Sequence, residues 1–128
     1  MTIPPDLKYT AAHQWVRQEA DGTASVGITF HAQEQLGDVV YVQQPAIGRK
    51  VARGETCALV ESVKAASDIP APLSGEIVAI NQAVADAPEQ LNRDPYNAWL
   101  FRIKPAAAAE FTALLDAAAY SKFVTTDD

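Results

Sequence analysis

The stretch Val60-Glu61-Ser62-Val63-Lys64-Ala65-Ala66-Ser67-Asp68 places a single lysine between two segments with strand character. Thr56–Val60 leads into it, and Ser67–Ile69 follows it before a Pro-Ala-Pro break. A strand, a short connection and a returning strand form a hairpin, so Lys64 is predicted at an exposed tip. The small side chains after the lysine leave room for another protein to approach. These properties suit a lysine that is modified and passed between enzymes, although most exposed lysines are plain surface residues.

The residues before this hairpin predict β-strands interrupted by one short helix. Asp21-Gly22 is a strong turn signal between two strand-like runs. Thr29 is a suitable N-cap and Gly37 a suitable residue past the end of a helix over residues 29–36. The strands expected in this part of the chain cover residues 13–17, 23–28 and 39–42.

The residues after the hairpin predict more β-structure and then a helix. A strand over 74–80 is followed by a polar loop over 81–97, with one helical turn near 89–91, and by a strand over 99–103. Pro105 is predicted to open a helix that runs through Tyr120. Its apolar face, which we expect to pack on a sheet, consists of Phe111, Leu114, Leu115 and Ala118.

Several short strands with one C-terminal amphipathic helix predict a mostly β sandwich. A chain of 128 residues fits a single domain, 1–128, with its core over about 7–124. Its 10 basic and 16 acidic residues give a net charge of −6, which argues against a nucleic-acid partner. No apolar run is long enough to cross a bilayer, and Met1–Asp6 resembles neither a signal nor a transit peptide. We therefore expect a cytoplasmic bacterial protein without a membrane partner.

No catalytic or metal-binding motif is visible in the sequence. The single cysteine, Cys57, lies in an apolar strand and is predicted to be a small core residue. His13 and His31 lie in no catalytic constellation, so we assign them structural or surface roles. We therefore expect no catalytic residue and no metal ligand in this chain.

The stretch from Glu61 to Asp68 resembles the lipoyl-attachment motif of the H proteins of the glycine cleavage system. Further pieces of the same family pattern occur in the same order along nearly the whole chain. Together they make the resemblance specific, although each alone is weak. These pieces are His13 with Trp15-Val16, Val26–Thr29, Ala32–Asp38, Asn92 with Asp94-Pro95-Tyr96, and Trp99.

The resemblance implies a lipoyl carrier with no catalysis of its own. Lys64 is expected to bear lipoate in amide linkage, within the motif formed by Glu61, Ser62, Val63, Ala65 and Asp68. The implied fold is a sandwich or flattened barrel of two antiparallel sheets, of the lipoyl-domain-like or hammerhead type, with short helices.

In this family the arm accepts the aminomethyl group left when a pyridoxal-phosphate glycine decarboxylase, the P protein, removes CO₂ from glycine. It offers the group to a tetrahydrofolate-dependent aminomethyltransferase, the T protein, and is reoxidised by dihydrolipoamide dehydrogenase, the L protein. A lipoate ligase or a lipoyl or octanoyl transferase is the expected modifying enzyme, and a carrier that visits several enzymes is expected to be a monomer.

Two positions depart from the family pattern near the cleft that holds the loaded arm. Gln14 stands where a glutamate is usual, and Ala12 where a serine is frequent. A neutral amide cannot pair with a methylamine cation as a carboxylate does. We therefore expect the adduct to be held less tightly, with Asp68 supplying more of the negative charge.

Other functions remain open from sequence alone. The chain could relay lipoate to other enzymes, or serve as a lipoyl carrier outside glycine breakdown. A biotin carrier is disfavoured, because Val63 and Ala65 stand where that family prefers methionine on both sides of its lysine. A thiol enzyme using Cys57 and a non-lipoylated β-sandwich interaction module are the alternatives from other classes.

Overall fold

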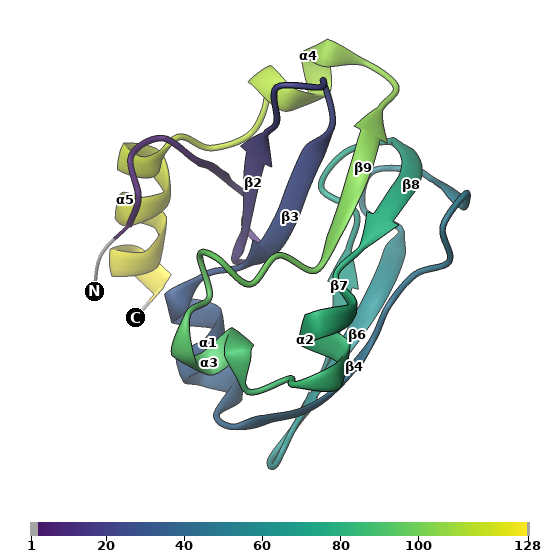
Figure 1. The fold of residues 1–128 in the computed structure, drawn as a ribbon. Coiled ribbons are helices and arrows are strands. Elements are labelled where there is room, and N and C mark those ends of the chain that lie inside the picture. The colour runs from purple at the N-terminus through teal and green to yellow at the C-terminus, as the bar shows by residue number, and fades with distance from the viewer. Residues whose placement is uncertain (1–2, 128) are drawn as a thin grey trace.

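The computed structural model describes residues 3–127 and shows two antiparallel sheets with short helices at their edges (Figure 1). The larger sheet has the strand order β1-β2-β3-β9-β8-β5, and the smaller sheet has the order β4-β6-β7. The strands are β1 (Lys8–Tyr9), β2 (Gln14–Gln18), β3 (Ala24–Ile28), β4 (Val39–Gln43), β5 (Lys50–Val51), β6 (Thr56–Ser62), β7 (Ala66–Pro70), β8 (Gly75–Ile80) and β9 (Phe101–Pro105). The helices are α1 (Phe30–Leu36), α2 (Gln82–Asp86), α3 (Gln90–Arg93), α4 (Ala108–Thr112) and α5 (Ala117–Asp127).

The predicted mostly β fold is confirmed, since alternating apolar residues from both sheets meet in one core. Val42 and Val60 form a cross-strand pair that turns inward from the smaller sheet. Val26 and Phe101 pair in the same way on the larger sheet. A second cluster joins α5 to the start of the larger sheet and contains Leu7, Tyr9, Trp15, Tyr120 and Val124.

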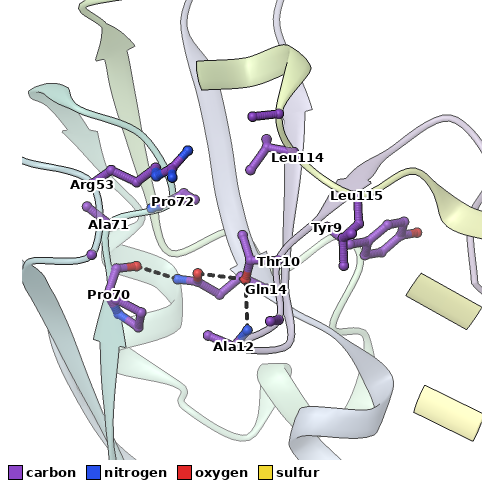
Figure 2. Close-up of a pocket in the computed structure, with 13 residues that line it drawn as sticks. Tyr9, Thr10, Ala12, Gln14, Arg53, Pro70, Ala71, Pro72, Leu114 and Leu115 are labelled. Atoms are coloured by element: carbon purple, nitrogen blue, oxygen red, sulfur yellow. Dashed lines mark hydrogen bonds between the residues drawn. The ribbon is translucent and has the colours of Figure 1, made fainter. Parts of the chain in front are cut away.

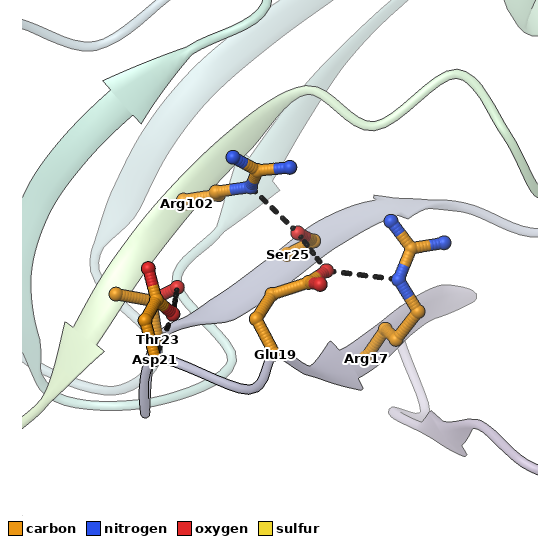
Figure 3. A network of polar contacts seen from close by, with 6 residues as sticks. All are labelled: Arg17, Glu19, Asp21, Thr23, Ser25 and Arg102. Carbon is orange, nitrogen blue, oxygen red and sulfur yellow. Dashed lines mark hydrogen bonds and ion pairs between the residues drawn. The ribbon is translucent and has the colours of Figure 1, made fainter.

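The hairpin of β2 and β3 forms where Asp21-Gly22 predicted it. Gly22 has a φ of 89°, which favours glycine, and the Asp21 carboxylate accepts from the Thr23 amide at 3.0 Å and from its hydroxyl. Figure 3 shows a further polar network across β2, β3 and β9. In it the Glu19 carboxylate accepts from Ser25 at 2.6 Å and from Arg17 at 2.8 Å.

The short helix predicted over residues 29–36 is also confirmed, as α1. Thr29 caps it by accepting a hydrogen bond from the Ala32 amide at 3.3 Å. Gly37 follows it with a φ of 76°, which returns the chain toward β4. The end of this helix lies beneath the Lys64 side chain.

The single helix predicted from Pro105 through Tyr120 is wrong in its extent. Pro105 ends β9, and the helical residues fall into α4 and α5 with a break at 113–116. Within the break, Leu115 and Tyr9 exchange two backbone hydrogen bonds of 2.8 Å. This bridge to β1 competes with the helical hydrogen bonds of the same backbone groups, so the helix is interrupted there.

The loop predicted over 81–97 contains more helix than expected. The turn predicted near 89–91 corresponds to α3, but α2 was not foreseen. Val84 on α2 and Leu91 on α3 are fully buried, so tertiary packing stabilises helices too short to be stable alone.

Candidate functional site

Lys64 lies at the tip of the hairpin formed by β6 and β7, as predicted. The hairpin projects beyond the rest of the molecule (Figure 1). Ser62 closes the tip, since its amide donates to the Ala65 carbonyl at 2.7 Å. The Ser62 hydroxyl oxygen accepts from the Lys64 amide at 3.3 Å and the Ala65 amide at 3.1 Å. Serine thus holds the backbone on both sides of the lysine in a compact turn.

The Lys64 side chain is exposed and rests on the glycine that ends α1. A Cβ built on Gly37 would lie 3.4 Å from Lys64 Cε and 3.9 Å from its Nζ. Among the described residues no hydrogen bond or ion pair holds the ammonium group. Its neighbour Val63 is 69% exposed, so the surroundings of the amine are open and partly apolar.

The tip is tied to the body through the segment that follows α1. The Val63 amide donates to the Asp38 carbonyl at 3.0 Å. On either side of Asp38, the Asn92 side chain donates to the Gly37 carbonyl at 2.8 Å and accepts from the Val39 amide at 2.8 Å. The sequence pattern gave Asn92 no role, because nothing local in a short polar turn shows which distant backbone its amide will reach.

A hollow of about 290 Å³ opens beside the tip, between the hairpin and α1. Its walls are mainly apolar or small, with His13, Gln35 and Ser67 as the polar contributors. It is lined by Ala12, His13, Ile28, Ala32, Gln35, Leu36, Ala65, Ala66, Ser67 and Ile69.

A second hollow, of about 390 Å³, shares Ala12 with the first and contains Gln14 and Arg53 (Figure 2). Gln14 is 1% exposed, and its amide nitrogen donates to the Pro70 carbonyl at 2.6 Å. Its carbonyl oxygen accepts from the Thr10 hydroxyl at 3.0 Å. Gln14 therefore links β2 to β7 across the two sheets, and Arg53 is the charged side chain among the residues that line this hollow.

Asp68 lines neither of these two hollows. It pairs with Leu59 on the outer face of the smaller sheet and lines a different hollow with Gln43 and Arg49. Alternate residues of a strand point to opposite faces, so Ser67 and Ile69 face the hollow beside the tip while Asp68 faces away from it. The expectation that Asp68 shares one cleft with Ala12 and Gln14 is therefore not met.

The two histidines lie together, and His13 packs against Tyr120 and Phe123 of α5. Their ring centroids are 4.4 Å apart, and His13 Nδ1 lies 2.8 Å from the Tyr120 hydroxyl. That hydroxyl is also 2.7 Å from the Thr29 hydroxyl oxygen. His13 has a φ of 62°, a strained value for a residue with a side chain. The cluster fastens α5 to the loop that walls the first hollow.

Comparison with known proteins decides which kind of protein presents this lysine. The sequence model of a family described as "Glycine cleavage H-protein" matches residues 7–127. The chain belongs to the glycine cleavage H-protein family. The glycine cleavage system H protein of Thiobacillus denitrificans is 60% identical over 127 residues, covering 99% of this chain and 98% of the relative. That of Nitrosospira multiformis is 57% identical over 128 residues, covering 100% and 99%. The crystal structure of the H protein of Mycobacterium marinum superposes with a TM-score of 0.84 at 44% identity, covering 98% of both chains.

As an H protein, the chain is the lipoyl carrier that shuttles the aminomethyl group in glycine cleavage, and it is a carrier subunit rather than a catalyst. The family carries lipoate on a lysine and works with the P, T and L proteins of the system. The named relatives are bacterial. Within residues 3–127, no helix has the length and apolar character needed to span a membrane.

Cys57 is inert in this H protein rather than catalytic. It is 4% exposed, and burial raises the pKa of its thiol to about 11, so the nucleophilic thiolate is scarce at neutral pH. The alternative of a thiol enzyme is therefore wrong.

The buried thiol predicts a loss of stability at alkaline pH. The Cys57 thiol has a pKa of 9.0 when unperturbed and about 11 in the folded chain, so the unfolded chain releases its proton first. The contribution of this thiol to the free energy of unfolding is fully present below pH 9. It is lost as the pH rises toward 11, by up to about 1.4 kcal/mol per pH unit. Urea unfolding between pH 8 and 11 should therefore show a shallower decline for Cys57→Ala than for the wild type. Equal declines in the two proteins would show that the pKa of the Cys57 thiol is not raised in the folded chain.

Proposed function

We propose that Lys64 is the lysine that carries lipoate and the aminomethyl group. The observation that supports this most directly is its position: an exposed amine at the tip of a projecting hairpin, without a partner among the described residues. A modifying enzyme can surround such an amine without unfolding the carrier. The deprotonated ε-amine attacks the acyl carbon of an activated lipoyl donor and an amide bond forms. The donor's leaving group departs with the electron pair of the broken bond, and the proton released from the nitrogen goes to solvent.

The chain's own residues hold the arm's root and leave the chemistry to the cofactor. Lipoate, when bound, supplies a disulfide that accepts both electrons and the aminomethyl group. Ser62 fixes the turn, and Asp38 anchors it through the Val63 amide. A tethered arm of this kind gives an effective concentration on the order of millimolar at a docked enzyme.

The hollow beside the tip is the proposed resting place of the loaded arm. Its apolar wall of Ile28, Leu36 and Ile69 suits a hydrocarbon chain and excludes water. Because the second hollow adjoins it at Ala12, an arm lying along the first directs its end toward Gln14. Gln14 offers no negative charge there, so the aminomethyl cation is held by shape and hydrogen bonds rather than by an ion pair.

Co-expression with a lipoate ligase followed by intact-mass measurement tests the proposed attachment. We expect one lipoyl group per chain, mapped to Lys64 after proteolysis. A folded sample that stays unmodified would contradict the proposal, and so would a lipoyl group mapped to another lysine.

Gln14→Glu is expected to slow the loss of aminomethyl from the loaded protein, because a carboxylate attracts the cation. The same change removes the amide donor to the Pro70 carbonyl, so the unloaded protein should lose about 1–3 kcal/mol of stability. The rate of formaldehyde and ammonia release and the urea midpoint measure the two effects separately. Gln18→Glu adds the same charge at an exposed position of β2 and is the control. An unchanged release rate in Gln14→Glu would exclude Gln14 from the arm's binding site.

We further propose a cytoplasmic monomer that is modified by a lipoate ligase or a lipoyl or octanoyl transferase. Support comes from the small amount of exposed apolar surface: the large exposed apolar side chains among the described residues are Val40, Tyr41, Ile47 and Val63. Sedimentation equilibrium should give the mass of one chain, and a dimer would refute the proposal.

A further inference from the structure

Both the nitrogen and the oxygen of the Asn92 side-chain amide form hydrogen bonds with residues around the segment beneath Lys64. Its nitrogen donates to the Gly37 carbonyl at 2.8 Å and to the Gln33 side chain at 3.0 Å. Its oxygen accepts from the Val39 amide at 2.8 Å. One side chain from α3 thus joins the end of α1 to the start of β4.

The tip that carries Lys64 is attached to the body through the same segment that Asn92 holds. Asp38, between the two backbone groups bound by Asn92, accepts the hydrogen bond from the Val63 amide at 3.0 Å. Gly37, whose carbonyl Asn92 binds, lies beneath the Lys64 methylenes. A Cβ built on Gly37 would lie 3.4 Å from Lys64 Cε. These two contacts, together with the pairing of Ser62 with Val39, all involve the three residues Gly37–Val39 that Asn92 holds.

We propose that Asn92 is a positioning residue for the carrier reaction: it fixes Gly37–Val39 and so sets the direction in which the lipoyl lysine leaves the protein. The inference rests on the proposed role of Lys64. Its physical basis is that the Ser62 hydroxyl stiffens the turn only internally, whereas the turn is attached to the body through Asp38 and through Val39, which pairs with Ser62. Without the Asn92 amide, the Gly37 carbonyl and the Val39 amide lose their partner at the point where the chain reverses.

The test compares Asn92→Ala with Asn81→Ala in the lipoylated full chain. Asn81 is half-buried like Asn92, and its side chain also binds a distant backbone carbonyl, that of Trp99 at 2.8 Å, but it does not contact the lysine segment. Both variants should lose similar stability. Only Asn92→Ala should raise the KM of the aminomethyltransferase for the loaded carrier, by about tenfold, since an arm root that is no longer held must be ordered when the arm enters the active site and this cost lowers the affinity. The kcat should change little, because the chemistry is unaltered once the arm is seated.

Asn92→Asp adds a signature that a merely structural role would not give. A charged aspartate still accepts from the Val39 amide but repels the Gly37 carbonyl, whereas the protonated acid can donate to it. The NMR amide shifts of Val63 and Lys64 should therefore differ from the wild type at pH 8 and return toward it as the pH falls.

Two outcomes would overturn the proposal. One is that Asn92→Ala and Asn81→Ala raise KM equally. The other is that the Val63 and Lys64 shifts of Asn92→Asp are independent of pH. The NMR measurement needs no lipoyl group, and intact mass reports modification of each variant, so failure of the Lys64 assignment is seen separately.

Discussion

Lys64→Arg is expected to abolish lipoylation and to reduce glycine-dependent turnover by the reconstituted system to background. Arginine keeps the positive charge and a long aliphatic stem, and Lys64 makes no side-chain hydrogen bond that the change would break within the described chain. The guanidinium does not lose its proton in proteins, so it cannot act as the nucleophile toward an activated acyl group. The melting temperature should remain that of the wild type, because an exposed substitution of this kind usually changes stability by less than about 0.5 kcal/mol.

Lys50→Arg is the matched control for this experiment. Lys50 is also exposed but belongs to β5 at the edge of the larger sheet. Intact mass and turnover of Lys50→Arg should equal those of the wild type. If Lys64→Arg were lipoylated, or supported undiminished turnover, the carrier would use another lysine.

The lysine hairpin and the first helix could be predicted because their signals are local. Lys64 lies between two strand-forming runs, and Thr29 and Gly37 mark the two ends of α1 with the residue types that cap a helix. The two-sheet arrangement came from the resemblance, because periodicity shows that a strand has a buried face but not which sheet contains it.

The two misses have different physical causes, which are a contact between residues far apart in sequence for Leu115 and the alternation of a strand for Asp68. Leu115 fits a helical face, yet it leaves the helix to pair with Tyr9. Asp68 lies near the lysine in sequence, but strand alternation turns it away from the hollow that Ala12 lines. The contact of Leu115 is set by the assembled sheets, so no local pattern reveals it. The alternation that turns Asp68 away follows from the strand itself.

Gly27→Ala is expected to destabilise the fold severely, although it adds only one methyl group. Gly27 pairs with Trp15 across β2 and β3, and a Cβ on Gly27 would overlap the indole ring. The ring is fully buried and fixed by its N–H, which donates to the Pro95 carbonyl at 2.8 Å. It cannot move aside without losing that hydrogen bond, so the cost should reach or exceed the upper end of overpacking penalties, about 3 kcal/mol. Thermal unfolding should show a drop of about 10 °C or more.

The double variant Trp15→Phe/Gly27→Ala identifies the cause of this loss. A phenyl ring is smaller than an indole and has no N–H anchored to Pro95, so it can yield to the added methyl group. The penalty of Gly27→Ala should therefore be smaller in the Trp15→Phe background, with a coupling of about 1 kcal/mol or more, as for residues in direct contact. If Gly27→Ala costs the same in both backgrounds, the indole is not what requires glycine. The glycine of the Val-Gly-Ile-Thr motif would then be needed for the backbone alone, although its φ does not lie in the positive range that favours glycine.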